Sequence, residues 1–509
     1  MSFENQPAAW TRTLLFCYLL LCVGLFAALS ARWKQVNDPV QLHYACFLMD
    51  HGMALYRDIL EINLPGTYLV NWTVIHTLGG GSVAWRLFDF GLMLVAAGAM
   101  IAIALPYDWL AGVLSAALFI LYHGKDGAGQ EGQRDLIIAV LLLCAYALVF
   151  DSFRNRRQWP LFVFGLCAGI AATIKPTPLP LTLLLLALAA FRWKRAGEPV
   201  VRPLLYAVAG LLIPFAVVVV FLAKQHSLGS FWYLLRVELP FYQMLGRKAW
   251  PKLFLLMLSP SVRILALFGV AIAMIRQKQS WETVLLATGI LFGMASFLIQ
   301  GKGFMYHRYP MLAFLFLWVA IELVSALRVP GIAGRVGFAG VAFALILLPV
   351  YLHVATKKVW AEQYPNALTA DLNRLGGQGL SGHVQCLDMP SDCDATLYRM
   401  QLVQSTGLFY DYLIFGSGQQ SVIRDVRARF WQEFQKNTPR VIVVGSDLFP
   451  AGLGYQKLAS WPRFQQELAS RYVLYEDRTF PRTEVGTRAY RIYVEKSEQP
   501  RATYASVIP

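Results

Sequence analysis

Long apolar runs alternate with short polar turns over roughly the first 355 residues of the chain. The first run, 12–31, has about 20 residues, which at about 1.5 Å per residue is enough to cross a bilayer core of roughly 30 Å. Residues 65–79 are also apolar, but Asn71, His76 and a glycine-rich end favour an interfacial segment. The remaining runs predict about eleven membrane-spanning helices in all, at 12–31, 87–105, 109–123, 135–150, 160–174, 177–192, 203–223, 252–275, 281–299, 310–327 and 337–355.

Basic residues cluster in four of the short turns: 153–157, 191–195, 276–278 and the pair Arg328 and Arg335. With the N-terminus in the cytoplasm, all four turns lie on the cytoplasmic side, as the positive-inside rule requires. Counting 65–79 as a span would move these turns outside. The following polar segments are then expected on the periplasmic side: 32–86, 124–134, the region around 175, 224–251, 300–309 and the tail from about 357.

Composition agrees with a polytopic membrane protein and excludes an ordinary soluble domain. Hydrophobic residues make up 57% of the chain and charged residues 15%, and the mean hydropathy is +0.49. The first apolar run is too long for a removable signal peptide and lacks its cleavage site. The net charge of +15 includes basic residues in the expected outer segments. A positive outer funnel suits an anionic, phospholipid-like substrate, although anchoring to lipid headgroups is the alternative.

The chain becomes polar after Lys358, and its pattern there changes to short strands and amphipathic helices. Strands are predicted at His383–Met389, Arg440–Gly445, Arg471–Glu476 and Arg488–Glu495, and helices at Thr396–Thr406, Ser421–Lys436 and Trp461–Ser470. This alternation predicts a small α/β soluble domain. It contains no phosphate loop, metal-ligand spacing or nucleophile elbow, so a lid or acceptor-docking role fits it better than catalysis.

Two cysteines of the tail have a different setting from the others. Cys386 and Cys393 have six residues between them and lie in a segment expected in an oxidising compartment, so a structural disulfide and two free thiols are both open. Free cysteines are expected within the spans, where they behave as small hydrophobic residues: Cys17, Cys22, Cys144 and Cys167.

Polar motifs follow one another in a fixed order in the expected outer segments. The first loop contains Asp38, Gly52, Tyr56-Arg57-Asp58, a Pro-Gly at 65–66 and then Arg86. Later come Gly132-Gln133-Arg134-Asp135, Gly165 and Gly169 followed by Lys175-Pro176, and Gly301-Lys302-Gly303 with Tyr306-His307-Arg308-Tyr309-Pro310. In order, spacing and side of the membrane, this series resembles the polyprenyl-phosphate-sugar glycosyltransferases of the type C membrane fold, over roughly residues 10–330. That family includes the dolichyl-phosphate-mannose protein mannosyltransferases and the lipid A aminoarabinose transferase.

The chain departs from the family at two points. Many members have a lysine directly before Pro-Pro-Leu, where this chain has Asn63-Leu64-Pro65-Gly66. The large sugar-binding insertions of the eukaryotic protein mannosyltransferases are absent, which favours a bacterial enzyme.

The resemblance implies an inverting hexosyl- or pentosyltransferase of the bacterial inner membrane. It would move a sugar from a polyprenyl-phosphate carrier to a periplasmic glycan, lipid or protein acceptor of the cell envelope. Residues 1–356 would form the transmembrane glycosyltransferase domain, with site residues in the first periplasmic loop at 32–86. Residues 357–509 would form the periplasmic α/β domain.

The resemblance also implies roles for individual residues. The matching acid, Asp38, would be the base that takes the acceptor's proton, because a neutral hydroxyl is a weak nucleophile. The phosphate leaves as a stable anion, so one carboxylate suffices, unlike the pair in glycoside hydrolases. Asp135 would orient the substrate or assist the base. The donor phosphate would be held by basic side chains, which are its natural ligands: Lys302, Arg308, Lys175 and Arg134. Substrate contacts are implied for Tyr56, Arg57, Asp58, Arg86, His307 and Tyr309.

Several of these residues also have a purely structural interpretation. Asp38 before Pro39 is also a plain helix start, in which the acid caps and the proline takes the first turn. Arg57 and Asp58 are also a local surface pair. The acid at 135 suits the positive end of a helix.

Lys175 can extend to the membrane interface, and His307 can be a hydrogen-bonded interface residue. Glu238 has no role in the pattern. The aromatic residues of 231–242 indicate an interfacial belt, with sugar stacking as the alternative.

We expect no metal or other cofactor. His43, Asp50 and His51 are close in sequence, but nothing completes a zinc site. A divalent cation shared by Asp38 and Asp135 is the alternative. No nucleic-acid partner is expected; the partners are the lipid-linked donor, the acceptor and membrane lipids.

Two other functions compete with this interpretation. An O-antigen ligase or polymerase also joins lipid-linked sugars, and it needs a late loop with paired Arg and His, as in His307-Arg308. A lipid-linked-sugar transporter would show repeated halves and charges in the middle of its spans. The polar motifs instead gather on one side, which favours the glycosyltransferase.

Overall fold

The computed structural model describes residues 9–277, 280–357, 362–388, 392–408, 410–446, 448–450, 454–481 and 489–498. The chain divides into two compact units. The first comprises Met1–Gln35, Asn63–Phe221 and Arg247–Val359. The second comprises Val36–Ile62, Leu222–Gly246 and Trp360–Pro509. Each unit therefore combines segments that are distant in the sequence.

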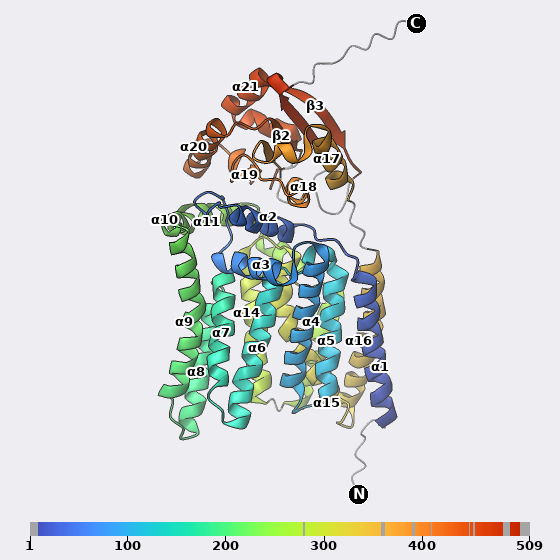
Figure 1. Cartoon of the computed structure of the whole chain (residues 1–509). Helices are drawn as coiled ribbons and strands as arrows, with labels where there is room; N and C mark the ends of the chain where they lie inside the picture. Colours follow the sequence, from blue (N-terminus) through green and yellow to red (C-terminus); the bar gives the residue numbers. More distant parts are fainter. Residues whose placement is uncertain are drawn as a thin grey trace, which may run out of the picture. The chain divides into compact units, whose positions relative to one another are not determined.

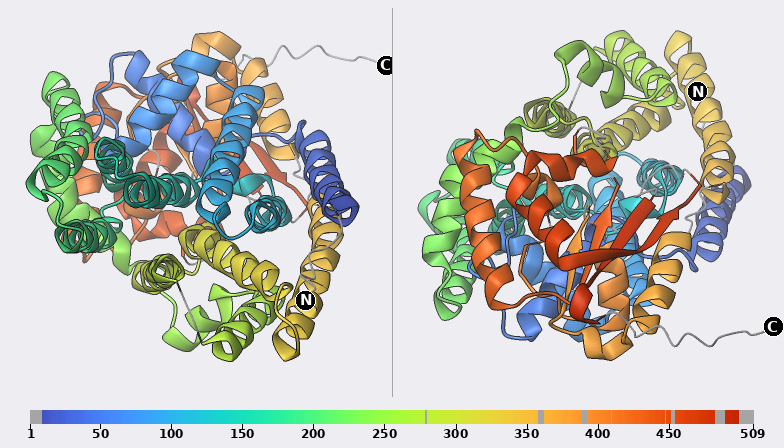
Figure 2. Two further views of the ribbon diagram at one scale, coloured as in Figure 1. Left: turned by 90° about the horizontal axis from the view of Figure 1, so that it is seen from below. Right: turned by 90° about the horizontal axis from the view of Figure 1, so that it is seen from above.

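The first unit is a bundle of long helices that run side by side (Figure 1) and are seen end-on from below in the left view of Figure 2. Its helices are α1 (Ala9–Ser30), α3 (Pro65–Leu78), α4 (Ser82–Ala104), α5 (Trp109–Asp126), α6 (Arg134–Asn155), α7 (Pro160–Ile174), α8 (Leu179–Arg195), most of α9 (Val201–Lys224), α12 (Trp250–Met257), α13 (Pro260–Arg276), α14 (Trp281–Gln300), α15 (Tyr309–Ala326) and α16 (Ile332–Thr356). Two short 3₁₀ helices, η1 (Ala128–Gln130) and η3 (Met305–Arg308), lie between them.

Small residues let the helices of this bundle approach closely, as they do in other membrane bundles. A Cβ atom at Gly165 of α7 would come within 2.0 Å of the Ala207 carbonyl oxygen of α9. A Cβ atom at Gly293 of α14 would come within 2.3 Å of the Met311 backbone of α15. Among the seven candidate spans, the one that contains α15 is the most enclosed, with 89% of its most apolar window buried. Helix α5 is also almost wholly buried, so the hydrophobic core of the bundle forms around α5 and α15.

Every run that the sequence predicts as a span is helical in the structure. The run 252–275 is divided into α12 and α13, which are bent by 76° at the break. Among the described residues, seven helices are long and apolar enough to cross a membrane, or eight if the bent pair is one span. The chain is thus a multi-pass membrane protein, and the number of eleven spans stays a prediction. Helix α3 has 14 residues and is not one of the seven.

The second unit contains a four-stranded sheet of order β1-β2-β4-β3, seen from above in the right view of Figure 2. Strands β1 (Val384–Leu387) and β2 (Val441–Gly445) are parallel, while β4 (Ala489–Glu495) pairs antiparallel with β2 and with β3 (Tyr472–Thr479). The tail helices are α17 (Gln363–Arg374), η4 (Gly377–Leu380), α18 (Cys393–Met400), α19 (Asp411–Ile414), α20 (Ser421–Lys436), η5 (Gly454–Ser460), α21 (Pro462–Arg471) and η6 (Lys496–Glu498). The predicted α/β character of the tail is confirmed.

Two earlier segments of the chain belong to the same unit. They carry α2 (Asp38–Asp50), α10 (Leu228–Tyr233), the π-helix η2 (Leu234–Glu238) and α11 (Leu239–Met244). The hydroxyl of Tyr44 in α2 donates to the Leu402 carbonyl and accepts from the Gln404 amide. These bonds tie α2 to the tail.

One predicted tail helix has the wrong bounds. The helix expected at Thr396–Thr406 is α18, which ends at Met400 because Gln401 adopts a left-handed conformation with φ of 54°. Cys386 and Cys393 form a disulfide with a Cα–Cα distance of 6.0 Å, which settles the open alternative. Four residues that the sequence predictions include lie outside the described residues: Lys278 of the third basic turn, Lys358, Met389 and Arg488.

Candidate active site

The loop between α14 and η3 places a lysine inside the first unit. Helix α14 ends at Gln300 because Gly301 takes a left-handed conformation with φ of 70°, which glycine adopts without strain. Lys302 follows, and it is only 5% exposed. A buried ammonium group is costly unless other groups stabilise its charge. The loop therefore holds a buried lysine whose charge depends on stabilising neighbours.

Lys175 and Asp135 form an ion pair close to this loop. Lys175 ends α7, and its Nζ donates to Asp135 Oδ2 at 2.5 Å and to Gln300 Oε1 at 2.8 Å. Asp135 is buried in the first turn of α6, where a carboxylate also suits the positive helix end. Asp135 can therefore have both of its predicted roles, at the positive end of the helix and in the site. Through Gln300, the pair lies beside the Lys302 loop.

A basic pair before α12 joins the same group. The backbone amide of Lys248 donates to the Gly301 carbonyl at 2.8 Å. A Cβ atom at Gly301 would lie 3.0 Å from the Arg247 guanidinium carbon, and one at Gly303 would lie 3.4 Å from the Lys248 side chain. Both basic residues therefore pack on the loop of Lys302.

We call Arg134, Lys175, Arg247, Lys248 and Lys302 the cation cluster. Burial, followed by the positive charges of Arg134, Lys175 and Arg247, lowers the pKa of Lys302 to about 7. The neighbours that lower this pKa are all cations. The buried His307 of η3 is within electrostatic range of four members of the cluster. The cluster brings three of the four predicted phosphate ligands together and presents an excess of positive charge, which favours an anion.

The fourth predicted phosphate ligand, Arg308, has a carboxylate partner in the structure. Its Nη2 donates to Asp126 Oδ2 at 2.8 Å, and its Nε donates to the Met305 carbonyl. Asp126 also pairs with Lys125 at 2.8 Å. This pairing occupies part of the guanidinium, so its role as a phosphate ligand stays a prediction.

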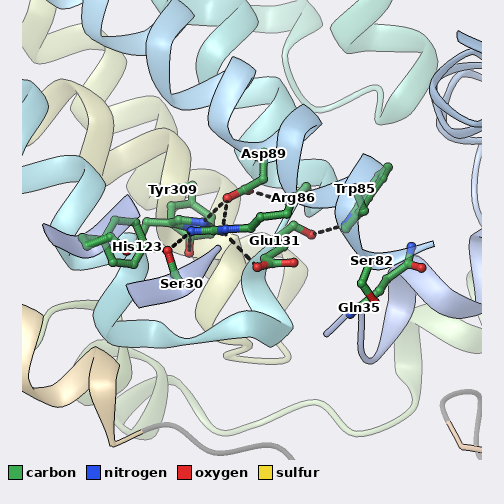
Figure 3. A network of polar contacts seen from close by, with 11 residues as sticks. Ser30, Gln35, Ser82, Trp85, Arg86, Asp89, His123, Glu131 and Tyr309 are labelled. Carbon is green, nitrogen blue, oxygen red and sulfur yellow. Dashed lines mark hydrogen bonds and ion pairs between the residues drawn. The ribbon is translucent and has the colours of Figure 1, made fainter. Parts of the chain in front are cut away.

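Arg86, for which a substrate contact was predicted, lies in a buried polar network (Figure 3). Its Nη1 donates to Asp89 Oδ2 at 2.7 Å and to Glu131 Oε1 at 2.9 Å, and its Nη2 donates to Ser30 Oγ. Burial, together with the charge of Asp89, raises the pKa of Glu131 well above its usual range. Arg86 thus has two buried carboxylate partners, Asp89 and Glu131. Arg86 is held by protein groups on both sides of its guanidinium.

The same network reaches Tyr309. His123 contacts Asp89 Oδ2 through Nε2 at 3.1 Å and the Tyr309 hydroxyl through Nδ1 at 2.8 Å. A neutral imidazole with its proton on Nε2 satisfies both contacts, because the tyrosine then donates to Nδ1. Tyr309 is fully buried and begins α15 directly after η3. Its hydroxyl therefore positions that helix start in the network.

The network also fixes the loop before Arg134. The backbone amide of Gly132 donates to Asp89 Oδ1 at 2.9 Å, and Trp85 Nε1 donates to the Glu131 carbonyl at 3.1 Å. Gly132 has a φ of 54°, and a Cβ atom there would lie 2.3 Å from the Trp85 ring. Only glycine fits both constraints. Because the loop leads directly into α6, the network sets where Arg134 begins that helix.

The remaining predicted site residues belong to the second unit. Asp38 is half-buried and is the first residue of α2; the capping position is Asn37, whose side chain makes no capping bond. Asp38 is therefore not the cap that the sequence suggested. Arg57 and Asp58 form a partly exposed pair at 2.8 Å, and Asp58 also accepts from the Ala54 amide. These contacts match the local interpretation of that pair. Tyr56 lines a cavity within this unit.

Among the described residues, no three His, Cys, Asp or Glu side chains are grouped so that they could hold a metal ion. Sequence reasoning missed Arg247 and Lys248 of the cation cluster, and Asp89, Glu131 and His123 of the network. A usable signal existed for the first two, since they are adjacent basic residues in the segment 224–251, which was expected outside.

No protein-family model matches the chain, and no curated protein sequence matches it. Solved structures do match. The structure of ArnT from Cupriavidus metallidurans bound to undecaprenyl phosphate is 12% identical, with a TM-score of 0.52, and the match covers 95% of this chain and 98% of that one. The apo structure of the same protein is 13% identical, with a TM-score of 0.54 and coverage of 97% and 99%. The type C glycosyltransferase fold that the sequence resemblance implied is thereby confirmed.

Proposed function

We propose that this protein is a membrane glycosyltransferase that takes a sugar from a polyprenyl-phosphate donor. The observation that carries the proposal is the cation cluster, in which five basic side chains gather around a buried loop with Asp135 as the carboxylate partner of Lys175. A phosphate group would relieve this charge excess through charge-assisted hydrogen bonds. The similarly folded ArnT has been solved with undecaprenyl phosphate bound, which supports a lipid-linked donor.

In the proposed reaction, the cation cluster holds the donor phosphate and stabilises it as it leaves. Lys302 and Lys175 contribute ammonium groups, and Arg134 and Arg247 contribute guanidinium groups that suit phosphate oxygens. The acceptor's hydroxyl or amine attacks the anomeric carbon with inversion, while Asp38 takes its proton. Asp135 orients Lys175 through their ion pair. The acceptor is a glycan, lipid or protein, and the active face and second unit lie in the periplasm of a bacterial inner membrane.

The test uses the purified full-length protein with a panel of polyprenyl-phosphate sugars. We expect release of polyprenyl phosphate with at least one donor, and loss of this release when Lys302 is replaced by Met. Arg202→Met, which removes an exposed arginine whose side chain contacts Tyr206 on α9, is the matched control and should leave release unchanged. If no donor is cleaved but intact lipid-linked sugars cross proteoliposome membranes, the transporter function replaces this proposal.

A further inference from the structure

The second unit contains a cavity of about 320 Å³ that the mechanism above does not use. Its walls come from three parts of the chain: Tyr56 after α2, Ser230 and Tyr233 on α10 with Glu238 at the end of η2, and Asp425 on α20. Ligand pockets range over about 300–1,000 Å³. This volume is at the lower end of that range and suits a ligand of about one ring.

Glu238 is the feature of this cavity that needs a ligand. It is 6% exposed and lines the cavity, yet it makes no hydrogen bond or ion pair within the described part of the chain. Burial first, opposed by Arg429 and reinforced by Asp425, raises the pKa of Glu238 to about 7. A buried carboxylate without a partner is costly. The fold tolerates it here, directly on the wall of a cavity.

The arginine that lines the cavity, Arg429, already makes hydrogen bonds with other groups of the protein. Arg429 donates through Nη1 to the Tyr56 carbonyl at 3.3 Å, through Nη2 to the Arg57 carbonyl at 2.7 Å, and through Nε to Glu433 at 3.3 Å. Its guanidinium therefore holds the wall formed by Tyr56. On the other side, Asp425 Oδ2 accepts from the Tyr233 hydroxyl at 2.7 Å. The oxygen atoms of Glu238 and Asp425 make this cavity rich in hydrogen-bond acceptors.

The backbone around the cavity is unusual at two places. Tyr56 has a φ of 65°, which is an outlier for a bulky residue and persists only where surrounding contacts enforce it. Residues Leu234–Glu238 form a π-helix, a rare element that is common at functional sites. Both features shape the wall of the cavity. The backbone conformation of Tyr56 accompanies a distance of 5.2 Å between its ring and that of Phe231, and the π-helix ends at Glu238.

We propose that this cavity binds one sugar ring, whose hydroxyl groups donate hydrogen bonds to Glu238 and Asp425 while the ring packs against the tyrosine side chains. Two carboxylates repel an anion, and an apolar ligand would leave Glu238 without a partner. A metal ion lacks a third carboxylate, histidine or cysteine ligand among the described residues. A hydroxyl-bearing ring of this size satisfies all three conditions. The bound ring would belong to the acceptor glycan. This assignment, unlike sugar binding itself, rests on the proposed function.

The test measures binding of monosaccharides to the full-length protein in detergent at pH 8, where Glu238 is ionised. Saturation-transfer NMR with glucose, mannose, galactose, N-acetylglucosamine and glucosamine should show binding of at least one sugar. Glu238→Gln keeps the size and removes the charge-assisted bond, so the affinity should fall by roughly 10- to 150-fold. Ser230→Trp, which fills the cavity, should abolish binding. Glu467→Gln on α21, which removes a partly exposed partner of Arg471, is the matched control and should change nothing.

A thermal unfolding measurement separates binding from folding. Glu238→Gln removes a buried charge without a partner, so its melting temperature at pH 8 should be equal to or above that of the wild type. A lower value would mean that Glu238 has a structural role and would overturn the proposal. Absence of sugar binding by the wild type, undiminished binding in both cavity variants, dependence on Ca²⁺, or equal binding of ethanolamine would each overturn it too.

Donor turnover distinguishes this inference from the proposed function. With an active donor and a glycan acceptor, Glu238→Gln should raise the acceptor KM and leave donor affinity unchanged. If donor is cleaved but no sugar binds the cavity, the inference fails and the proposed function stands. If sugars bind and no donor in the panel is cleaved, the cavity is confirmed as a sugar site and the proposed function fails.

Discussion

Donor binding should weaken as the pH rises through 7, because Lys302 must be protonated to bind a phosphate. The pKa of Lys302 in the ligand-free protein is lowered to about 7 by burial and neighbouring cations. A bound phosphate reverses this shift, so binding takes up a proton above pH 7 and is disfavoured there. The protonated fraction of such a group falls from about 0.9 at pH 6 to about 0.1 at pH 8. The dissociation constant should therefore rise about tenfold over this range.

The assay is the affinity of a polyprenyl-phosphate sugar for the purified protein, measured by calorimetry at several pH values. The donor is a phosphodiester and does not titrate between pH 6 and 8, whereas a phosphate monoester, with a second pKa of about 6, would confuse the result. Lys302→Arg keeps its charge at every pH and should give a flat profile. Lys302→Met should bind about 10- to 150-fold more weakly at pH 6, also with a flat profile.

Other titratable groups face the cluster, and the controls must account for them. His307 is the nearest imidazole, so His307→Gln should keep the slope if Lys302 is responsible. Asp135 also belongs to this surrounding, where it forms an ion pair with Lys175. A pH-independent affinity in the wild type, or the same slope in Lys302→Arg, would refute the reasoning.

Three further predictions follow from the geometry. Asp38→Asn should lower turnover on the order of 10²- to 10⁴-fold while donor affinity is kept, as measured by polyprenyl phosphate release; near-normal turnover would exclude Asp38 as the base. Arg86→Met should destabilise the protein by about 3–5 kcal/mol in thermal unfolding, because Asp89 and Glu131 lose their buried arginine partner; an unchanged melting temperature would contradict this. Cysteines introduced beside Asp38, Asp135, Lys175 and His307 should react with a membrane-impermeant thiol reagent in intact spheroplasts, and labelling only after lysis would disprove the shared outer face.

The helices of the bundle could be predicted from sequence because each is coded locally by a long apolar run. The break between α12 and α13 was missed although Pro260 marks it, since a run that is apolar on both sides of a proline still reads as one span. The membership of α2 in the second unit could not be predicted. It depends on contacts such as that between Tyr44 and Leu402, which are 358 residues apart, and no local pattern encodes them.

The candidate site could be predicted in part. The order of the motifs predicted Lys175, Arg134 and Lys302 as ligands of one phosphate. In the structure, Lys302 lies within electrostatic range of the other two. Arg308 was grouped with Lys302 because the two are close in sequence, but its charge is paired with Asp126, 182 residues earlier. Such pairings depend on tertiary structure, so sequence reasoning can identify the basic residues of a site without showing which carboxylates they pair with.

Two groups of charges lie close together along one loop of the first unit: the network around Arg86 and the cation cluster. Around Arg86, the guanidinium group donates to the carboxylates of Asp89 and Glu131, so its positive charge has negative partners. Directly after the loop, Arg134 begins α6, and its charge is one of those that lower the pKa of Lys302. Repulsion among like charges costs free energy. Proteins accept such local costs at functional sites when neighbouring structure compensates for them. The network therefore supplies the loop that leads into the cation cluster, and a phosphate bound there would offset the repulsion among the positive charges of the cluster.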